Sequence, residues 1–266
     1  MSKMAKTMKI IVGGIRLVLT LVALTWPSLA PAREAARPAV ARGAMQVDRD
    51  SSSTGPLPSA SLPLAGRPRM ADFLGEIVSK DARRVADWVV ASGDNHGLPF
   101  VIIDKVAAKV FVFDLGGRLR GATLALLGKA RGDDSVPGIG SRKLSAIRPE
   151  ERTTPAGRFV AALGRDLEHD ILWIDYGTSI SLHRVITGNP GDHRLQRLAT
   201  TSTLDKRISY GCVNVPVKFY EDIVLGAFAG TTGIVYILPE IKTIQEVFPM
   251  AASAGVAMGD DALRIR

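Results

Sequence analysis

"FVIIDKVAAKVFVFDLGGRL", residues Phe100–Leu119, is the stretch that decides the fold of this chain. Two runs rich in β-branched and aromatic residues, FVIIDK and KVFVFD, lie on either side of a short break, and Gly116-Gly117 supplies a turn before the next segment. Short apolar runs bounded by turn residues are typical of consecutive β-strands. The stretch therefore predicts a β-hairpin that begins a sheet.

The segments after the hairpin continue the β pattern. Further strands are predicted for LRGATLALLG, GRFVAALG, DILWIDYG, SISLHRV and GIVYILPE, with turn residues between them. One helix interrupts the strands, with Pro216 in its first turn and FYEDIVLGAF behind it. The predicted fold class is mainly β: a largely antiparallel sandwich or barrel-like domain over residues 99–240, with a helix after the only cysteine.

A short helix is predicted before this domain. In DARRVADWVVAS, Val85, Trp88 and Val89 recur at helical spacing, and Gly93 ends the pattern. This helical segment, residues 71–98, is expected to pack on the β-domain. After the domain, residues 241–266 are predicted to form a C-terminal tail that is frayed beyond Pro249.

The first 32 residues have the pattern of an export signal. Three lysines before residue 10 precede the apolar stretch LVLTLVALTW, and an Ala-x-Ala cleavage pattern ends at Ala32. The alternative is an uncleaved membrane anchor, although Arg16 and Pro27 weaken a spanning helix. Both interpretations place the body of the chain outside the cytoplasm, on the periplasmic or cell-wall side. Residues 33–70, rich in Ala, Pro, Ser, Gly and Arg, are predicted to be a disordered linker.

Composition and charge narrow the classes of function. With 266 residues, of which 46% are hydrophobic, the chain can bury a sizeable core. The net charge is +8, but four of the positive charges lie in the first 32 residues, and no basic stripe interleaves with aromatic residues. We therefore expect no nucleic-acid partner, and membrane contact only through the N-terminal segment.

Cys212 lies in RISYGCVNVP, residues Arg207–Pro216, and is the only cysteine of the chain. It cannot form an internal disulfide, and an unpaired thiol in an oxidising compartment calls for a reason. A nucleophilic thiolate needs a base within reach. Gly211 allows the backbone to turn tightly just before the cysteine. From these residues alone, Cys212 is either a nucleophile or a small buried hydrophobic residue.

Four histidines are candidates for the base. His96 and His169 lie in the polar turns GDNHGLP and LEHD and are predicted to be solvated, and His193 lies in the turn-rich GDHRLQR. In SISLHRV, strand alternation places His183 and Ser181 on the face opposite to the apolar residues. A histidine at the end of an apolar strand is held by a rigid element, which suits a base; a satisfied core histidine is the alternative.

The segment Ser209-Tyr210-Gly211-Cys212-Val213-Asn214, with His183 upstream, resembles the signature of the YkuD-like L,D-transpeptidases. That family's pattern is a His, a spacer, and then Ser/Thr-His-Gly-Cys-apolar-Asn or -Arg. RTTPAGRF, residues Arg152–Phe159, resembles the family's Thr-Pro-x-Gly-x-Phe segment, and the hairpin quoted above resembles its opening hairpin. These motifs together extend from Pro99 to Glu240.

The resemblance implies an exported cysteine acyltransferase of cell-wall biogenesis and cell shape. Cys212 would attack the carbonyl of a peptidoglycan stem peptide and form a thioester, with His183 as the base, and an amine of a neighbouring stem would resolve the thioester. Peptidoglycan stem peptides are thus the expected partners, and carbapenems are expected to acylate the thiol as inhibitors. No metal or organic cofactor is implied.

The resemblance also implies supporting roles for the residues around the pair. The N–H groups of Gly211 and Cys212 would form the oxyanion hole, while Ser209 and Asn214 would brace the loop. The main-chain carbonyl of Arg184 would orient the base.

Two departures from the family pattern concern the site itself. The second histidine of the family is Tyr210 here, whose hydroxyl either donates a hydrogen bond near the reacting carbonyl or leaves the ring to pack against the loop. The spacer between His183 and Ser209 is longer than in the family, and His193 matches the family spacing better. We prefer His183 because it lies on a strand, whereas His193 follows TGNPGD, which is typical of an inserted lid. His193 is kept as the alternative base.

Two other functions fit the same residues. The first is a non-catalytic cell-wall-binding module that has kept the fold and lost activity with the second histidine. The second is a thiol amidase or peptidase that uses water in place of an amine. The sequence does not separate transfer from hydrolysis, because the difference depends on how well water is excluded from the thioester.

Overall fold

The computed structural model describes residues 69–166 and 169–251. The predicted signal segment (1–32), nearly all of the predicted linker (33–70) and the end of the predicted tail lie outside these residues. Among the helices of the described ranges, none has the length and apolarity needed to cross a bilayer.

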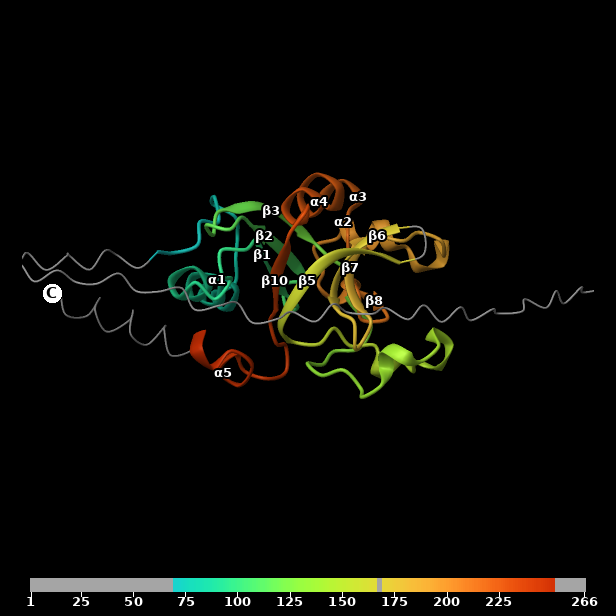
Figure 1. The fold of residues 1–266 in the computed structure, drawn as a ribbon. Coiled ribbons are helices and arrows are strands. Elements are labelled where there is room, and N and C mark those ends of the chain that lie inside the picture. The colour runs from blue at the N-terminus through green and yellow to red at the C-terminus, as the bar shows by residue number, and fades with distance from the viewer. Residues whose placement is uncertain (1–68, 167–168, 252–266) are drawn as a thin grey trace, which may run out of the picture. The chain divides into compact units, whose positions relative to one another are not determined.

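Most of the strands form one mixed sheet, which lies at the centre of the described chain (Figure 1). Its order is β3-β2-β1-β10-β5-β6-β7-β9, with β1 parallel to β10, β7 parallel to β9, and the remaining pairs antiparallel. The prediction of a mainly-β fold is confirmed. The strands are β1 (Phe100–Asp104), β2 (Lys109–Phe113), β3 (Leu119–Leu124), β5 (Gly157–Asp166), β6 (His169–Asp175), β7 (Ile180–Arg184), β9 (Val213–Val215) and β10 (Thr232–Ile237).

The two edges of this sheet meet, so that the sheet is a nearly closed barrel. Just beyond β3, Leu126 exchanges two backbone hydrogen bonds with Asn214 of β9, at 2.8 and 2.9 Å. Beside this seam, β4 (Leu127–Gly128) runs parallel to β8 (Arg207–Ser209). The barrel-like architecture predicted from the sequence is therefore present, and its seam lies next to the cysteine.

The barrel interior is filled by side chains that alternate along the strands with outward-facing ones. The interior residues of β1, Val101 and Ile103, pack with Val110 and Val112 of β2 and Val235 of β10. Every residue of β1 is buried because the other face of this strand is also covered. This double burial explains why the opening stretch of the hairpin is apolar throughout rather than alternating.

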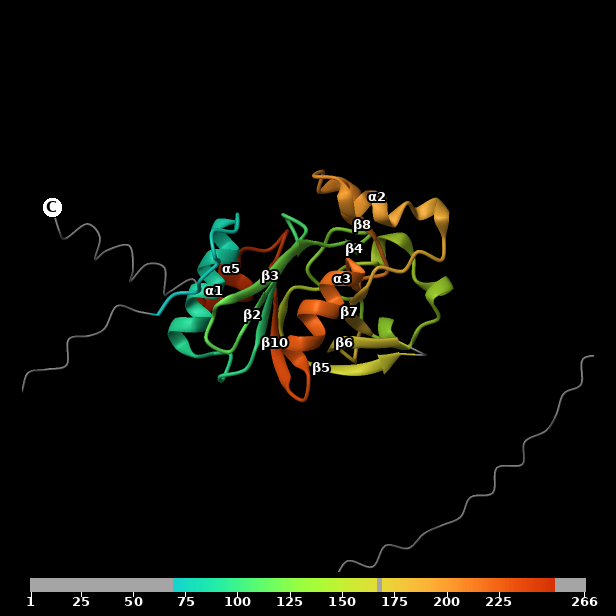
Figure 2. The ribbon, with the colours of Figure 1, turned by 90° about the horizontal axis from the view of Figure 1, so that it is seen from above.

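The second face of β1, β2 and β10 packs against helices. The α1 helix (Lys80–Ser92) ends at Gly93, as predicted; Ser79 caps its start, and Gly93 has the left-handed conformation. Its Val85 and Val89 are fully buried against this face, where α5 (Ile244–Val247) also packs (Figure 2). The segment predicted as a tail thus contributes a short helix to the second core.

The predicted helix after the cysteine is present, in three consecutive parts. These are α3 (Val217–Phe219), a π-helical turn (Tyr220–Val224) and α4 (Leu225–Phe228). Tyr220, Val224 and Phe228 enter the barrel core and cover one end of it. A further α-helix, α2 (Arg194–Ala199), lies in the segment between β7 and β8.

The structure differs from the sequence prediction around Cys212. The short strands β8 and β9 flank the cysteine and were not predicted, because three residues give too little periodicity to indicate a strand. Parallel pairs also occur where the prediction was largely antiparallel. His169, predicted to lie in a turn, is the first residue of β6.

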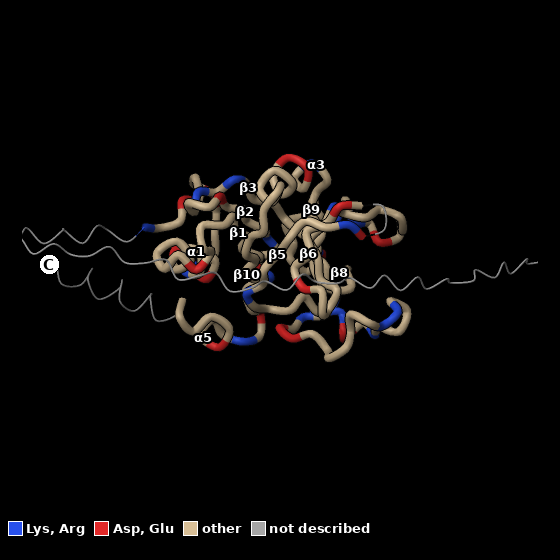
Figure 3. The backbone as a smooth tube through the Cα atoms, in the orientation of Figure 1, with Lys and Arg blue, Asp and Glu red and all other residues tan. Residues whose placement is uncertain are grey.

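Charged residues of both signs are interspersed along the described backbone (Figure 3). Many of them form ion pairs, such as Arg158 with Asp94 and Arg184 with Asp170.

Candidate active site

Cys212 lies in the turn between β8 and β9, two residues before Asn214 of the barrel seam. The parallel pairing of β7 with β9 aligns Leu182 with Val213 and His183 with Asn214. This register brings the end of β7 alongside the cysteine. Strand alternation then presents Ser181 and His183 together on the face that carries the thiol.

The Cys212 thiol is held by groups of the β7 segment. Ser181 Oγ donates to the Cys212 Sγ at 3.5 Å, and the Sγ lies 3.5 Å from the carbonyl oxygen of Ser179. Burial raises the pKa of the Cys212 thiol, but hydrogen bonding to His183, the charge of His183 and hydrogen bonds from Ser181 outweigh it. The net result is a pKa below the ordinary value of a thiol, as a nucleophilic cysteine requires.

His183 has its proton positions fixed by its neighbours. Its Nδ1 lies 2.7 Å from the carbonyl oxygen of Arg184, which can only accept, so Nδ1 carries the hydrogen. The Nε2 atom is then left with a lone pair that can take a proton from the thiol. The Arg184 side chain is fixed in turn by Asp170 and Glu221 and lies over the Tyr220 ring. The sequence expectation for the Arg184 carbonyl agrees with this geometry.

Ser209 and Gly211 shape the turn that carries the thiol. The Ser209 hydroxyl donates to the Cys212 carbonyl at 2.6 Å and accepts from the Gly211 N–H at 3.1 Å. Gly211 has φ +134°, and a Cβ there would lie 2.6 Å from Ile180 Cδ1 and 2.7 Å from the Thr153 carbonyl oxygen. Only glycine fits this position.

The prediction that the Gly211 N–H belongs to the oxyanion hole needs a correction. That N–H is already a donor to Ser209 Oγ, which leaves it no hydrogen for a substrate oxygen. The Cys212 N–H has no hydrogen-bond partner among the residues that the structure describes. Of the two expected donors, Cys212 is thus the one that is available.

Asn214 connects the thiol turn with the base. Its Nδ2 donates to the Cys212 carbonyl at 3.3 Å and lies 3.4 Å from His183 Nε2. Arg194, from the start of α2, donates to Asn214 Oδ1 at 2.9 Å and is held by Asp192 at 2.9 Å. Because a guanidinium only donates, this contact sets which way the Asn214 amide faces.

Tyr210 forms part of the site wall through its ring. The Arg152 guanidinium lies over the ring, 3.9 Å from its centroid, and donates to the Ile147 carbonyl at 3.0 and 3.2 Å. Within the described ranges, the Tyr210 hydroxyl has no hydrogen-bond partner. The ring therefore has a fixed place by cation–π contact, and Tyr210 lines the cavity described next.

The thiol faces a cavity of about 740 Å³. Its wall is formed by β6, β7, the Cys212 turn, Arg194 and the segment before β5, and it includes Cys212, His183, Ser209, Tyr210 and Asn214. His169, predicted to be solvated, is exposed at the wall of the same cavity. His193 is exposed, lies outside the cavity wall and caps α2 with φ +50°.

Three residues near the thiol were not singled out from the sequence. Ser181 could have been found, since it shares the strand face of His183. Thr154, in the TTPAG segment, donates to the Gly211 carbonyl at 2.8 Å, and only its place in a family-like motif pointed to it. No sequence signal indicated Arg194, because it comes from the segment between β7 and β8. Within the described ranges, no group of three or more His, Cys, Asp or Glu side chains could hold a metal ion.

Comparisons with known proteins give structural similarity only. No protein-family model matches the sequence, and no curated protein matches it. Among solved structures, the helical cell shape determining protein Pgp2 from Campylobacter jejuni is similar at 14% identity, with 61% of this chain and 57% of Pgp2 covered and a TM-score of 0.38. This chain therefore spans little more than half of the Pgp2 structure.

L,D-transpeptidase structures are also similar. The catalytic domain from E. faecium L,D-transpeptidase matches at 16% identity over 52% of this chain and 95% of that domain, with a TM-score of 0.34. The L,D-transpeptidase from Xylanimonas cellulosilytica matches at 18% identity over 53% of this chain and 60% of its own chain, with a TM-score of 0.34. Both matches are structural similarities to L,D-transpeptidases, the family that the sequence resembles, at low identity and low TM-score.

Proposed function

We propose that this chain is a cysteine acyltransferase that acts on peptidoglycan stem peptides through a Cys212 thioester, that is, an L,D-transpeptidase. The observation that carries the proposal is the pairing of Cys212 with His183. The thiol has a lowered pKa, faces a cavity of about 740 Å³ and lies beside an imidazole whose Nε2 is left without a proton by the contact of Nδ1 with the Arg184 carbonyl. The motif resemblance of the sequence supplies the substrate class.

The first half of the reaction forms the thioester. His183 Nε2 takes the thiol proton, and the thiolate attacks the carbonyl carbon of a donor stem peptide. The resulting oxyanion accepts a hydrogen bond from the Cys212 N–H. The C–N bond then breaks, and His183 returns the proton to the leaving amine. The amide bond is lost and the thioester bond is gained.

The second half transfers the acyl group. The amine of a neighbouring stem attacks the thioester carbonyl and gives a proton to His183, and the new amide forms as the C–S bond breaks. The cavity is of the size that holds peptide-like ligands. Its wall combines apolar groups such as Ile171 and Trp173 with polar ones such as Arg194, which suits a peptide substrate.

The proposal includes an exported location. The N-terminal segment has the pattern of a signal peptide or anchor, which would place the domain on the periplasmic or cell-wall side, where peptidoglycan lies. Carbapenems are proposed as inhibitors that acylate Cys212, because the acylated thiol copies the thioester.

The test is to incubate the purified chain with disaccharide-tetrapeptide and follow the products by mass spectrometry, with Cys212→Ala as the control. A cross-linked dimer formed by the wild type and absent with Cys212→Ala supports the proposal. Release of disaccharide-tripeptide without any cross-link would replace transfer by hydrolysis. Binding without either product would instead support the non-catalytic wall-binding module.

A further inference from the structure

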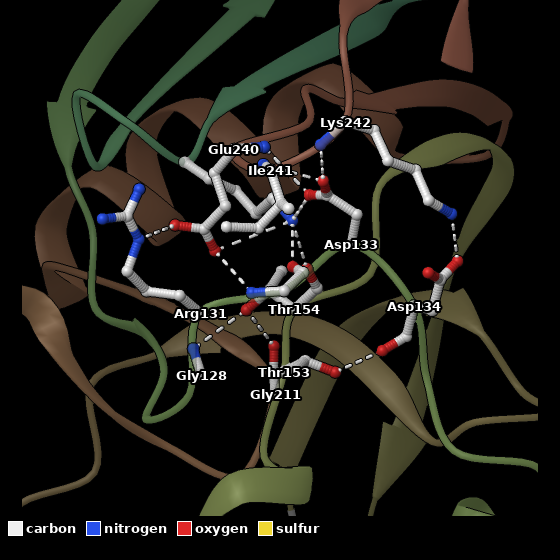
Figure 4. Close-up of polar contacts among 12 residues, drawn as sticks. Gly128, Arg131, Asp133, Asp134, Thr153, Thr154, Gly211, Glu240, Ile241 and Lys242 are labelled. Atoms are coloured by element: carbon white, nitrogen blue, oxygen red, sulfur yellow. Dashed lines mark hydrogen bonds and ion pairs between the residues drawn. The ribbon is translucent and has the colours of Figure 1, made fainter. Parts of the chain in front are cut away.

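Thr154 holds the peptide unit that carries the cysteine. Its side chain is completely buried, and its Oγ1 accepts from the Gly128 N–H at 2.9 Å and donates to the Gly211 carbonyl at 2.8 Å (Figure 4). An amide N–H can only donate and a carbonyl oxygen can only accept, so the single hydroxyl hydrogen must point at Gly211. The direction of this bond is therefore fixed by its two partners.

The Gly211 carbonyl and the Cys212 N–H belong to one peptide unit. The bond between them is trans, so the two groups point in opposite directions across the same plane. A carbonyl that points into the buried interior toward Thr154 therefore turns the Cys212 N–H away from that interior. This N–H is the donor that the proposed mechanism leaves for the oxyanion.

We propose that Thr154 is a positioning residue that aims the Cys212 N–H at the oxyanion by anchoring the Gly211 carbonyl. Thr154 touches neither the substrate nor the reacting atoms. This role rests on the proposed use of Cys212 as an acyl acceptor, and it adds a residue that sets oxyanion stabilisation rather than thiol reactivity.

Thr154 is anchored in turn by a buried cation. Lys105 is fully buried, and its Nζ donates to the Thr154 carbonyl at 2.7 Å, to the Gly132 carbonyl at 2.6 Å and to Asp133 Oδ1 at 2.6 Å. Asp133 also accepts from the backbone N–H groups of Glu240, Ile241 and Lys242. A fully satisfied buried network of this kind is rigid.

The same network holds the chain just before the thiol turn. Arg207, two residues before Ser209, makes two hydrogen bonds to Glu240, at 2.7 and 3.0 Å, and one to the Lys105 carbonyl at 2.9 Å. The turn is therefore fixed at Arg207 on one side and at Gly211 on the other. Both anchors come just before the Cys212 N–H in the chain, and the Gly211 anchor belongs to the same peptide unit as that N–H.

Two reactions of the Cys212 thiol can distinguish a Thr154 that aims the oxyanion donor from a Thr154 that only stabilises the fold. Alkylation by iodoacetamide is a displacement in which the thiolate replaces iodide, and no oxyanion forms. Acylation by p-nitrophenyl acetate passes through an oxyanion before p-nitrophenolate leaves and the acetyl thioester remains. Loss of an aligned oxyanion donor slows only the second reaction.

The experiment measures both rates for wild type, Thr154→Val, Thr154→Ser and Val85→Ala in the full chain. Thr154→Val keeps the shape and removes the hydroxyl, whereas Thr154→Ser keeps the hydroxyl. We expect Thr154→Val to slow acylation about 10–100-fold, since one misaligned oxyanion donor acts on this scale, and to change alkylation less than about threefold. Thr154→Ser should restore the ratio of the two rates. Val85→Ala, a buried change in α1 far from the site, should lower the melting temperature and leave the ratio unchanged.

Several results would overturn the proposal. These are an unchanged ratio in Thr154→Val, an equal fall in both rates, no rescue by Thr154→Ser, or no acylation of the wild-type thiol when it is alkylated normally. Thr154→Ala takes the place of Thr154→Val if the valine variant does not fold. Neither reagent contains peptidoglycan. An inactive wild type on disaccharide-tetrapeptide would therefore reject the proposed substrate while the Thr154 result stood.

Discussion

Two polar clusters flank the Gly211–Cys212 turn, and they are built in opposite ways. In the Lys105 cluster (Lys105, Asp133, Arg207 and Glu240), each buried charge has a partner of opposite sign, and Lys105 and Asp133 also bind main-chain groups. In the Cys212 cluster (Cys212, His183, Ser181 and Asn214), the thiol and the imidazole face a cavity and depend on one another. The first cluster is closed and the second is open.

The difference indicates which cluster is the candidate for chemistry. Buried ion pairs whose hydrogen bonds are all satisfied fix a conformation and have no free group to offer. A thiol with a lowered pKa beside a base, in a cavity, is instead what a functional site requires. Damage to the closed cluster should therefore appear in stability, and damage to the open cluster in rate.

The largest effect should come from removing the nucleophile. Cys212→Ala should abolish turnover of tetrapeptide substrate and adduct formation with a carbapenem, because no other cysteine exists in the chain. The unfolding midpoint in urea should stay close to that of wild type, since the change is small and the Ser181 contact is a weak one. Residual turnover by the alanine variant would contradict the catalytic interpretation of the open cluster.

The next effect should come from the base. His183→Ala should slow turnover about 10²–10⁴-fold, the usual scale for a general base, and His193→Ala, outside the cavity, should change it little. His183→Ala should also raise the pKa of Cys212, because burial raises that pKa and the opposing interaction is lost. The acid limb of iodoacetamide alkylation should therefore move to higher pH. The reverse ranking of the two histidines would place the base on the segment between β7 and β8.

The closed cluster should respond in stability. Asp133→Asn should lower the free energy of unfolding by about 3–5 kcal/mol, the scale for breaking a buried ion pair by removing one partner, as measured by urea unfolding. Its neighbour Asp134, exposed and paired with Lys242 at the surface, is the matched control, and Asp134→Asn should cost under about 1 kcal/mol. Comparable losses in the two variants would remove the distinction between the clusters.

The same carboxylate gives the closed cluster a pH signature. Burial raises the pKa of Asp133, but hydrogen bonds from Lys105 and the backbone outweigh it and lower the pKa from its ordinary 3.8 to about 2. A depressed folded-state pKa contributes stability above the ordinary value, and this stability is lost as the pH falls from about 4 toward 2. Asp133→Asn should flatten that part of the stability curve, whereas Asp134→Asn should not.

The smallest effect should come from the residue that departs from the family pattern. Tyr210→Phe keeps the ring beneath Arg152 and removes only the hydroxyl, so we expect turnover within about twofold of wild type across the pH range. Kinetics from pH 5 to 9 would measure this. A fall of tenfold or more would show that the hydroxyl donates in the reaction, at the scale of a lost buried hydrogen bond.

Much of the fold could be predicted because its signals are local. The apolar runs of β1 and β2, the turn at Gly116-Gly117, and the stop of α1 at Gly93 each depend on neighbouring residues. The parallel pairing of β1 with β10 could not be predicted, because residues far apart in the chain decide it. The strands β8 and β9 were too short to leave a pattern.

The residues of the candidate site can also be divided into those that the sequence indicated and those that it did not. Cys212 and His183 could be proposed from motif and strand alternation, and the structure brings them together. The hydrogen bond from the Gly211 N–H to Ser209 could not be predicted, since it depends on the orientation of the Ser209 hydroxyl. Thr154 and Arg194 reach the turn from distant segments through side-chain contacts, and no pattern in the sequence records such contacts.

The seam between Leu126 and Asn214 has a consequence for when the thiol becomes reactive. The backbone of Asn214 closes the barrel, and its side chain contacts both the Cys212 carbonyl and His183. In an unfolded chain, Cys212 is an ordinary thiol without a neighbouring base. A contact between segments so far apart in sequence requires the closure of a long loop, which costs conformational entropy. The thiol therefore has these partners only in a chain whose barrel is closed, and an incompletely folded molecule would lack the arrangement that the proposed acylation requires.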